Sequence, residues 1–178
     1  METIATAIDG VRLATLTSHA DARGSFCEAF RASWFGGGRS WVQWNVSRSN
    51  AGVLRGLHFH RLQTDYWFVV DGLLQVALVD LRPDSISHRQ ALCLELDGAV
   101  PSGLIIPPGV VHGYRALRDT TLMYLLDREY NGSDECGVRW DDPALGLAES
   151  WYAGPKPVLS ARDAAAPMLH EAISRSTA

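Results

Sequence analysis

The chain has 178 residues, 47% of them hydrophobic and 20% charged, which is enough to bury the core of one domain, and we expect a single domain over residues 1–178. Its formal net charge of −4 provides no general attraction to nucleic acid or to an anionic membrane surface, so neither is expected as a partner. No apolar run approaches the roughly 20 residues that span a bilayer, and the N-terminal METIATAIDGVRLA lacks the pattern of a signal peptide, so we expect a cytoplasmic protein.

Apolar residues recur with the two-residue period of β-strands through most of the chain. Turn signals such as DG at 71–72 and PPG at 107–109 separate the apolar runs at near-regular intervals, which is typical of a β-sandwich or barrel. A helical segment is expected after Leu159, and Pro167 should interrupt it. The expected strands cover residues 41–47, 53–59, 65–70, 73–81, 90–96, 103–106, 112–117 and 121–127.

The segment 56–72, GLHFHRLQTDYWFVVDG, places two histidines inside one of these strands. His58 and His60 are two residues apart, so both side chains leave the same face of the strand. A short turn brings Asp65 back on the neighbouring strand, and His112 opens a later strand. Three imidazoles and one carboxylate can therefore converge inside a barrel.

HFHRLQTD followed by Gly72, and PPGVVH at 107–112, resemble the two metal-binding motifs of cupins. An aspartate stands in place of the usual glutamate, the glycine ahead of the first histidine is too close to it, and the asparagine that ends the second motif is missing. Imidazole and carboxylate ligands suit zinc, iron, nickel or manganese. One hypothesis is therefore a metal-dependent isomerase or dioxygenase that holds a divalent transition metal with a set of four side chains, His58, His60, Asp65 and His112.

A second resemblance extends over residues 20 to 170. Seven segments follow the order and spacing of dTDP-4-dehydrorhamnose 3,5-epimerases, namely DARGSFCEAF, QWNVSRSNAGVLRGLHF, VALVDLRPDS, IPPGVVHGY, TTLMYLLDREY, GVRWDDPALGL and LSARDAAAP. The resemblance implies an all-β fold, a cupin-like jelly-roll β-barrel with a short C-terminal helical segment. It also implies a dTDP-4-keto-6-deoxyhexose as substrate, no cofactor, and a homodimer whose subunits exchange N-terminal strands. The biological setting it implies is deoxysugar or rhamnose-type biosynthesis.

Epimerisation beside a C4 ketone removes a carbon-bound proton to give an enolate and returns a proton on the opposite face. By similarity to the family, His58 is the base and Asp163 is its carboxylate partner. Such a carboxylate orients an imidazole and favours its protonated form, which raises its basicity. Tyr124 is by similarity the acid that delivers a proton on the other face.

Arg23 and Arg55 fill the positions that grip the diphosphate, a task suited to the forked guanidinium group. Phe26 and Tyr130 fall on positions that pack against the thymine base. In a dimer with exchanged strands, the residues near Arg23 and Phe26 would complete the site of the other subunit. The remaining positions that the resemblance assigns to nucleotide or sugar contacts are Glu28, Gln43, Asn45, His112, Glu135 and Arg162.

The chain departs from the family where His60 replaces a glutamine and Asp65 replaces a lysine, with a shorter loop between them. The lysine's charge would stabilise the enolate oxygen, and loss of such a group commonly costs roughly 3 kcal/mol or more of transition-state stabilisation. Protonated His60, His112 or a bound metal could take that role. A third hypothesis is a non-catalytic homologue that binds the sugar nucleotide without turning it over. We favour the epimerase.

Overall fold

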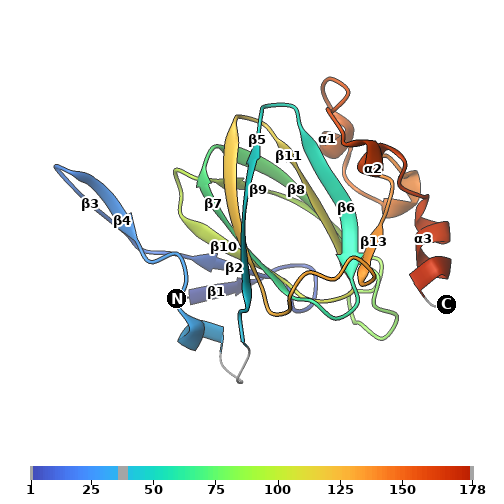
Figure 1. Ribbon diagram of the computed structural model, residues 1–178, viewed down its shortest axis with the longest axis horizontal. Coiled ribbons are helices and arrows are strands. Elements are labelled where there is room, and N and C mark those ends of the chain that lie inside the picture. Colours follow the sequence, from blue (N-terminus) through green and yellow to red (C-terminus); the bar gives the residue numbers. More distant parts are fainter. Residues whose placement is uncertain (1, 36–39, 177–178) are drawn as a thin grey trace.

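The computed structural model describes residues 2–35 and 40–176, and these form two antiparallel sheets that face each other, with one hairpin projecting from the body (Figure 1). The first sheet has the strand order β1 (Glu2–Ala5), β2 (Arg12–Thr15), β10 (Ser102–Ile106), β7 (Asp65–Asp71), β12 (Thr120–Leu126) and β5 (Gln43–Ser49). The second has the order β13 (Glu135–Gly137), β6 (Leu54–His60), β11 (Val110–Ala116), β8 (Leu73–Asp80) and β9 (Ala91–Asp97). The hairpin consists of β3 (Ser18–Asp21) and β4 (Gly24–Cys27).

The main core lies between the two sheets, because each sheet turns alternate apolar side chains inward. Trp67 and Leu122 enter it from the first sheet, and Val76 and Leu78 enter it from the second. One end of the roll is less completely filled by apolar side chains, and polar residues line a cavity there.

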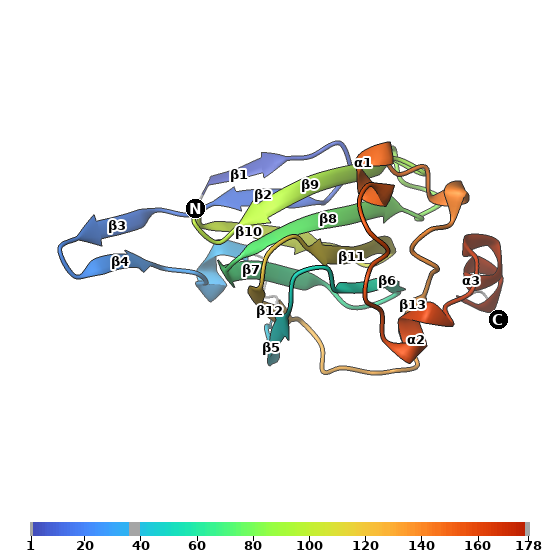
Figure 2. The same cartoon turned by 90° about the horizontal axis from the view of Figure 1, so that it is seen from above.

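A second core covers the outer face of the second sheet. The chain after β13 supplies the 3-10 helix Pro143–Leu145 and the helices α1 (Glu149–Tyr152), α2 (Ala161–Ala164) and α3 (Leu169–Ser176), which lie beside that sheet (Figure 2). Trp151 and Leu169 from this segment pack against Leu57 and Phe59 of β6. Helix α2 lies next to β6. Within the described residues, no helix has both the length and the apolar character needed to cross a membrane.

The predicted jelly-roll architecture is confirmed, and all eight predicted strands are present with ends within two residues of those expected. Pro167 separates α2 from α3, as predicted. Sequence analysis missed β1 to β4, β13 and α1. Strands β1 and β3 are exposed along their whole length, so they carry no alternating apolar signal, and β13 is only three residues long.

Candidate active site

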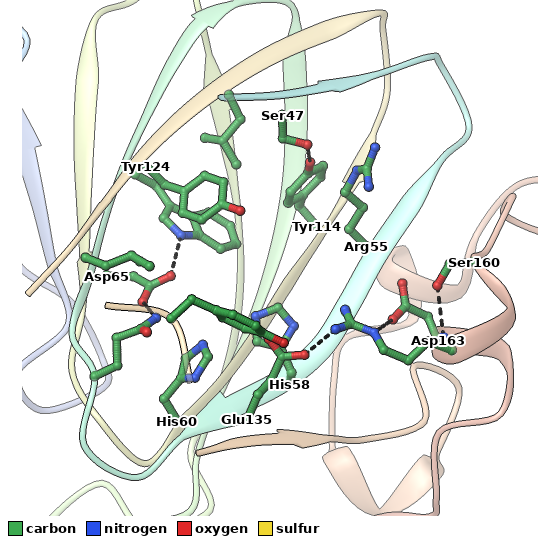
Figure 3. A pocket seen from close by; sticks show the side chains of 17 residues that line it. Ser47, Arg55, His58, His60, Asp65, Tyr114, Tyr124, Glu135, Ser160 and Asp163 are labelled. Carbon is green, nitrogen blue, oxygen red and sulfur yellow. Dashed lines mark hydrogen bonds and ion pairs between the residues drawn. The ribbon is translucent and has the colours of Figure 1, made fainter. Parts of the chain in front are cut away.

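A cavity of about 450 Å³ opens between the sheets, and it has the size of a small-molecule pocket. Its walls come from β5, β6, β7, β11, β12 and β13, and helix α2 closes one side (Figure 3). The metal-ligand candidates His60 and Asp65 line it together with the residues of the epimerase hypothesis. Seven residues predicted from the family resemblance line it, namely Arg55, His58, Tyr124, Tyr130, Glu135, Arg162 and Asp163.

Three imidazoles gather at one end of the roll, and two of them, His58 and His60, line the cavity. Alternation along β6 turns His58 and His60 toward the cavity and turns Leu57 and Phe59 into the outer core. His112 on β11 lies directly opposite His58 in the antiparallel pairing, and their ring centroids are 4.6 Å apart. Ligand nitrogen atoms of the three histidines all lie within 4.8 Å of one another. The expected convergence of the imidazoles is therefore present, but His112, which was also predicted to contact the substrate, is not among the residues that line the cavity.

Burial sets the ionisation of these histidines. Burial, followed by repulsion from the other two imidazoles, holds the pKa of His58 well below its usual range. Burial also lowers the pKa of His60 to about 4, with a further contribution from His112, and burial lowers the pKa of His112 to about 4. All three imidazoles are therefore neutral at neutral pH, the form in which a histidine offers a lone pair.

Hydrogen bonds fix the tautomer of only one of the three. Because a carbonyl oxygen can only accept, the contact of 2.9 Å between His112 Nδ1 and the Val110 oxygen places the His112 proton on Nδ1. The lone pair of His112 is then on Nε2, which is buried and has no hydrogen-bond partner among the described residues. The Nδ1 atoms of His58 and His60 are buried and unpartnered within the same part of the chain. Three unsatisfied imidazole nitrogens thus belong to a single cluster.

Asp65 lies at the start of β7 beside this cluster. Its carboxylate accepts hydrogen bonds from Gln63 Nε2 at 2.7 Å and from Trp67 Nε1 at 3.1 Å. Asp65 Oδ2 is 3.8 Å from the unpartnered Nε2 of His112. Burial raises the pKa of the Asp65 carboxyl, although the neighbouring His60 and the two hydrogen-bond donors oppose this shift.

Asp163 enters the cavity from helix α2, on the side away from Tyr124 in Figure 3. The Ser160 hydroxyl caps this short helix by accepting from the Asp163 amide at 3.0 Å. No hydrogen bond joins Asp163 to His58 in the part of the chain that the structure describes. Instead, Asp163 accepts from Arg162 Nε at 3.2 Å, and the same guanidinium pairs with Glu135. The expected base and its expected partner line one cavity, but no hydrogen bond joins them among the described residues.

Tyr124 faces the cavity from β12 in the opposite sheet, between its paired neighbours Trp67 and Asn45. Burial, followed by the charge of Asp65, raises the pKa of the Tyr124 phenol. The phenol is therefore protonated at neutral pH, which is the state required of an acid. His58 and Tyr124 thus approach the cavity from different sheets.

Arg55 lies at the rim of the cavity on β6, where its Nε donates to Ser49 Oγ at 2.9 Å. Gln43 and Asn45 occupy the face of β5 that carries Ser47, which also lines the cavity. The Gln43 amide donates to Asn45 Oδ1 at 3.0 Å and accepts from the Tyr130 backbone amide at 2.7 Å. The two amide side chains are thus beside the cavity, although they do not line it.

Arg23, Phe26 and Glu28 are not brought to this cavity within one chain. Arg23 lies at the tip of the projecting hairpin and pairs with Asp21 at 2.6 Å, and its side chain is exposed (Figure 1). Phe26 and Glu28 border a separate hollow near the base of the hairpin. The expected pair of diphosphate-binding arginines is therefore not assembled by a single copy of the protein.

Sequence reasoning missed several residues that line the cavity, among them Ser47, Gln63, Trp67 and Tyr114. Three of them could have been found from the sequence, because each lies two residues along a strand from a predicted site residue and so shares its face. Trp67 lies two residues after Asp65, Tyr114 lies two residues after His112, and Ser47 continues the Gln43–Asn45 face. The Tyr114 hydroxyl lies 2.9 Å from Ser47 Oγ, and this hydrogen bond joins β11 to β5 across the cavity wall.

A sequence profile of dTDP-4-dehydrorhamnose 3,5-epimerases matches residues 5–171. The spore coat polysaccharide biosynthesis protein SpsL of Bacillus subtilis is 38% identical over 149 residues, which cover 79% of this chain and 95% of the relative. An epimerase of Mycobacterium tuberculosis has a solved structure with a TM-score of 0.91 and 35% identity, covering 98% of this chain and 91% of the other. A Legionella pneumophila epimerase, solved with dTDP-4-keto-L-rhamnose, has a TM-score of 0.87 and 32% identity, covering 95% and 93% of the two chains.

Proposed function

This chain belongs to the dTDP-4-dehydrorhamnose 3,5-epimerase family, and from that premise we propose that it inverts C3, C5 or both of a dTDP-4-keto-6-deoxyhexose in deoxysugar biosynthesis. The observation that carries this proposal is the position of His58. It is a neutral, cavity-lining imidazole that faces Tyr124 on the other sheet. A base and an acid on two sides of one cavity suit the removal of a proton from one face of a sugar ring and its return to the other.

His58 takes the hydrogen from the carbon next to the ketone. The hydrogen is acidified by the C4 carbonyl, and the electron pair of the broken bond moves into the enolate. Tyr124 then delivers its phenolic proton to the same carbon from the opposite face. Removal and return of a proton change no oxidation state, so this route uses no redox cofactor.

Asp163 is assigned the role of carboxylate partner to His58. In the free protein, Arg162 holds Asp163 and Glu135 together. Substrate phosphate is a competing anion for that guanidinium, and its binding would release Asp163 toward the imidazole. Hydrogen bonds of this kind are often incomplete before substrate binds and form in the complex.

The enolate oxygen cannot be stabilised here by a lysine ammonium, because Asp65 occupies that position. The neutral His60 and His112 imidazoles each have one N–H group, which needs no protonation to form a hydrogen bond. The raised pKa of Asp65 lessens the repulsion that a carboxylate would exert on the enolate. His60 is therefore assigned as the principal donor, since the Nδ1–H of His112 is already bonded to Val110.

A homodimer completes the substrate site in this proposal. Arg23 lies at the turn of the hairpin and does not line its own cavity, and large apolar side chains are exposed on the hairpin and on β5. Phe26 is 64% exposed, and Trp44 and Val46 on the outer face of β5 are 60% and 58% exposed. Exposed apolar groups of this size mark contact surfaces. A second copy could cover them and place its Arg23 opposite Arg55 at the phosphate end.

Heavy-water exchange tests the proposed function. The purified protein is incubated with dTDP-4-keto-6-deoxyglucose in deuterated buffer, and the C3 and C5 signals are followed by proton NMR. We expect the C3 signal, the C5 signal or both to disappear, with accumulation of an epimer. Tight binding of dTDP without exchange at high protein concentration would contradict the proposal and favour a non-catalytic binding protein.

A further inference from the structure

We propose that His58, His60, His112 and Asp65 form a binding site for one divalent transition-metal ion. The site lies at the inner end of the cavity, and its ligands would be three imidazole nitrogens and one carboxylate oxygen. It goes beyond the epimerase mechanism proposed above, in which no step uses a metal. Two of its members, His60 and Asp65, stand where the family resemblance implies a glutamine and a lysine.

The distances suit a shared ion. Zinc binds imidazole nitrogen at about 2.0–2.1 Å, so two nitrogens on one ion lie within roughly 4.2 Å of each other. Ligand nitrogens of His58, His60 and His112 already lie within 4.8 Å of one another. His112 Nε2 is 3.8 Å from Asp65 Oδ2, too far for a hydrogen bond and within the span of two ligands on one ion. The three imidazoles form the compact part of the set, and Asp65 joins it through its distance to His112.

The hydrogen-bond pattern around these side chains favours a cation as their common partner. The His112 proton is on Nδ1, so the buried Nε2 presents a lone pair toward the oxygen of Asp65. Two electron-rich atoms facing each other in a buried site repel, unless a cation lies between them. The Nδ1 atoms of His58 and His60 are also buried without partners among the described residues. Burial of such groups is costly when nothing binds them.

The surrounding contacts resemble the support that metal ligands receive. The Val110 carbonyl orients His112, and Gln63 and Trp67 orient Asp65 by hydrogen bonds to its two oxygens. Partners of this kind hold a ligand's lone pair in the direction of the ion. His60, His112 and Asp65 are each at most 3% exposed, so thermal motion of the set is limited by packing. The nitrogen-rich ligand set selects zinc, nickel, iron or manganese over calcium or magnesium.

Metal binding and epimerisation compete for His58. A metal ligand must give its nitrogen lone pair to the ion, whereas a base must keep the same lone pair for the substrate proton. An occupied site therefore suppresses proton abstraction. This consequence, unlike the site itself, rests on the proposed function.

Cobalt(II) titration of the protein without an affinity tag tests the site in the absence of substrate. The chain is first stripped with a chelator, and visible absorption then reports the coordination of Co²⁺. The pocket variants are His60→Gln and Asp65→Asn, which keep polar side chains of similar size. His170→Ala is the matched control, because this histidine lies on α3 with its side chain 79% exposed.

The wild-type chain and His170→Ala should each bind one Co²⁺ per chain with the same spectrum, and both pocket variants should bind at least about tenfold more weakly. Thermal unfolding verifies that each variant is folded. Absence of saturable binding by the wild-type chain, or equal affinity in the pocket variants, overturns the proposed site. In a separate arm, Zn²⁺ at saturation should abolish the deuterium exchange of the wild-type protein and a chelator should restore it. Exchange that persists in the zinc-saturated protein overturns the competition but not the site.

Discussion

At the scale of single residues, the proposed base and the proposed acid lie on opposite sides of the cavity because they come from strands of different sheets. His58 comes from β6 in one sheet, and Tyr124 comes from β12 in the other. Alternation along a strand predicted the inward direction of His58 and His60 from the sequence. The ion pair between Arg162 and Glu135 could not be predicted, because it depends on how helix α2 lies relative to β13.

Replacement of Tyr124 by phenylalanine removes the acid and leaves the base in place. His58 should then still abstract a proton and return a solvent deuteron to the same face. Deuterium incorporation into unconverted substrate should therefore continue, while formation of the epimer falls by roughly 10²- to 10⁴-fold. NMR of substrate and product in heavy water measures both rates. Equal loss of the two rates would argue against Tyr124 as the acid.

At the scale of secondary-structure elements, β6 approaches β11 closely enough to place His58 over His112. Gly56 makes this approach possible, since it has a φ of +99° and a Cβ there would lie 3.0 Å from the His112 carbonyl oxygen. The strands that build the cavity were predictable because their apolar residues alternate. The hairpin β3–β4 was not, because almost all of its side chains are solvent-exposed and no core selects its residues.

Substitution of Gly56 by alanine should lower the free energy of unfolding by about 1–3 kcal/mol, because it adds a close contact to an unfavourable backbone conformation. Gly52→Ala is the matched control. Gly52 also has a positive φ, +85°, but nothing lies within 4 Å of a Cβ at that position. Urea unfolding measures the loss of stability in both variants. The loss in Gly52→Ala reports the unfavourable backbone conformation alone, and the additional loss in Gly56→Ala reports the close contact with β11. A Gly52→Ala variant as unstable as Gly56→Ala would show that crowding between β6 and β11 is unimportant.

The end of β8 gives a prediction for pH dependence. Burial raises the pKa of Asp80, but hydrogen bonds from Arg82, Ser85 and Ser87 outweigh burial and hold this pKa far below its usual range. A carboxyl with a lowered folded pKa stabilises the fold above its unfolded pKa of about 3.9 and loses that contribution as the pH falls further.

The free energy of unfolding of Asp80→Asn should therefore be lower than that of wild type at pH 7. This difference between the two proteins should be smaller at pH 3. Urea unfolding of the two proteins at both pH values measures the difference. A gap in unfolding free energy that is the same at pH 7 and pH 3 would show that the ionised carboxylate contributes nothing.

At the scale of the whole molecule, the proposed site is shared between two copies. Periodicity and composition could predict the two-sheet roll, but they contain no information on contacts between subunits. The expectation that Arg23 serves another chain came from the family resemblance alone. The exposed hairpin and the exposed apolar face of β5 are what the structure adds in support.

Coexpression of two inactive chains tests this shared site. One chain carries His58→Asn and the other carries Arg23→Ala, so a mixed dimer retains one site with an intact His58 and the other copy's intact Arg23. A random mixture of a closed two-fold dimer should recover about a quarter of the wild-type activity. Each variant expressed alone should remain inactive. Failure of the mixed preparation to exceed the separate variants would place Arg23 outside the site of the second copy.

The role of His58 is tested most directly by deuterium exchange into dTDP-4-keto-6-deoxyglucose, measured for the wild-type chain, His58→Asn and His170→Ala. Binding of dTDP is measured for all three proteins, so that a slower exchange cannot be caused by failure to bind the nucleotide. The wild-type chain and His170→Ala should exchange the hydrogens next to the ketone at equal rates, and His58→Asn should exchange them at least about 10²-fold more slowly. Undiminished exchange by a folded, dTDP-binding His58→Asn protein would contradict the assignment of this imidazole as the base.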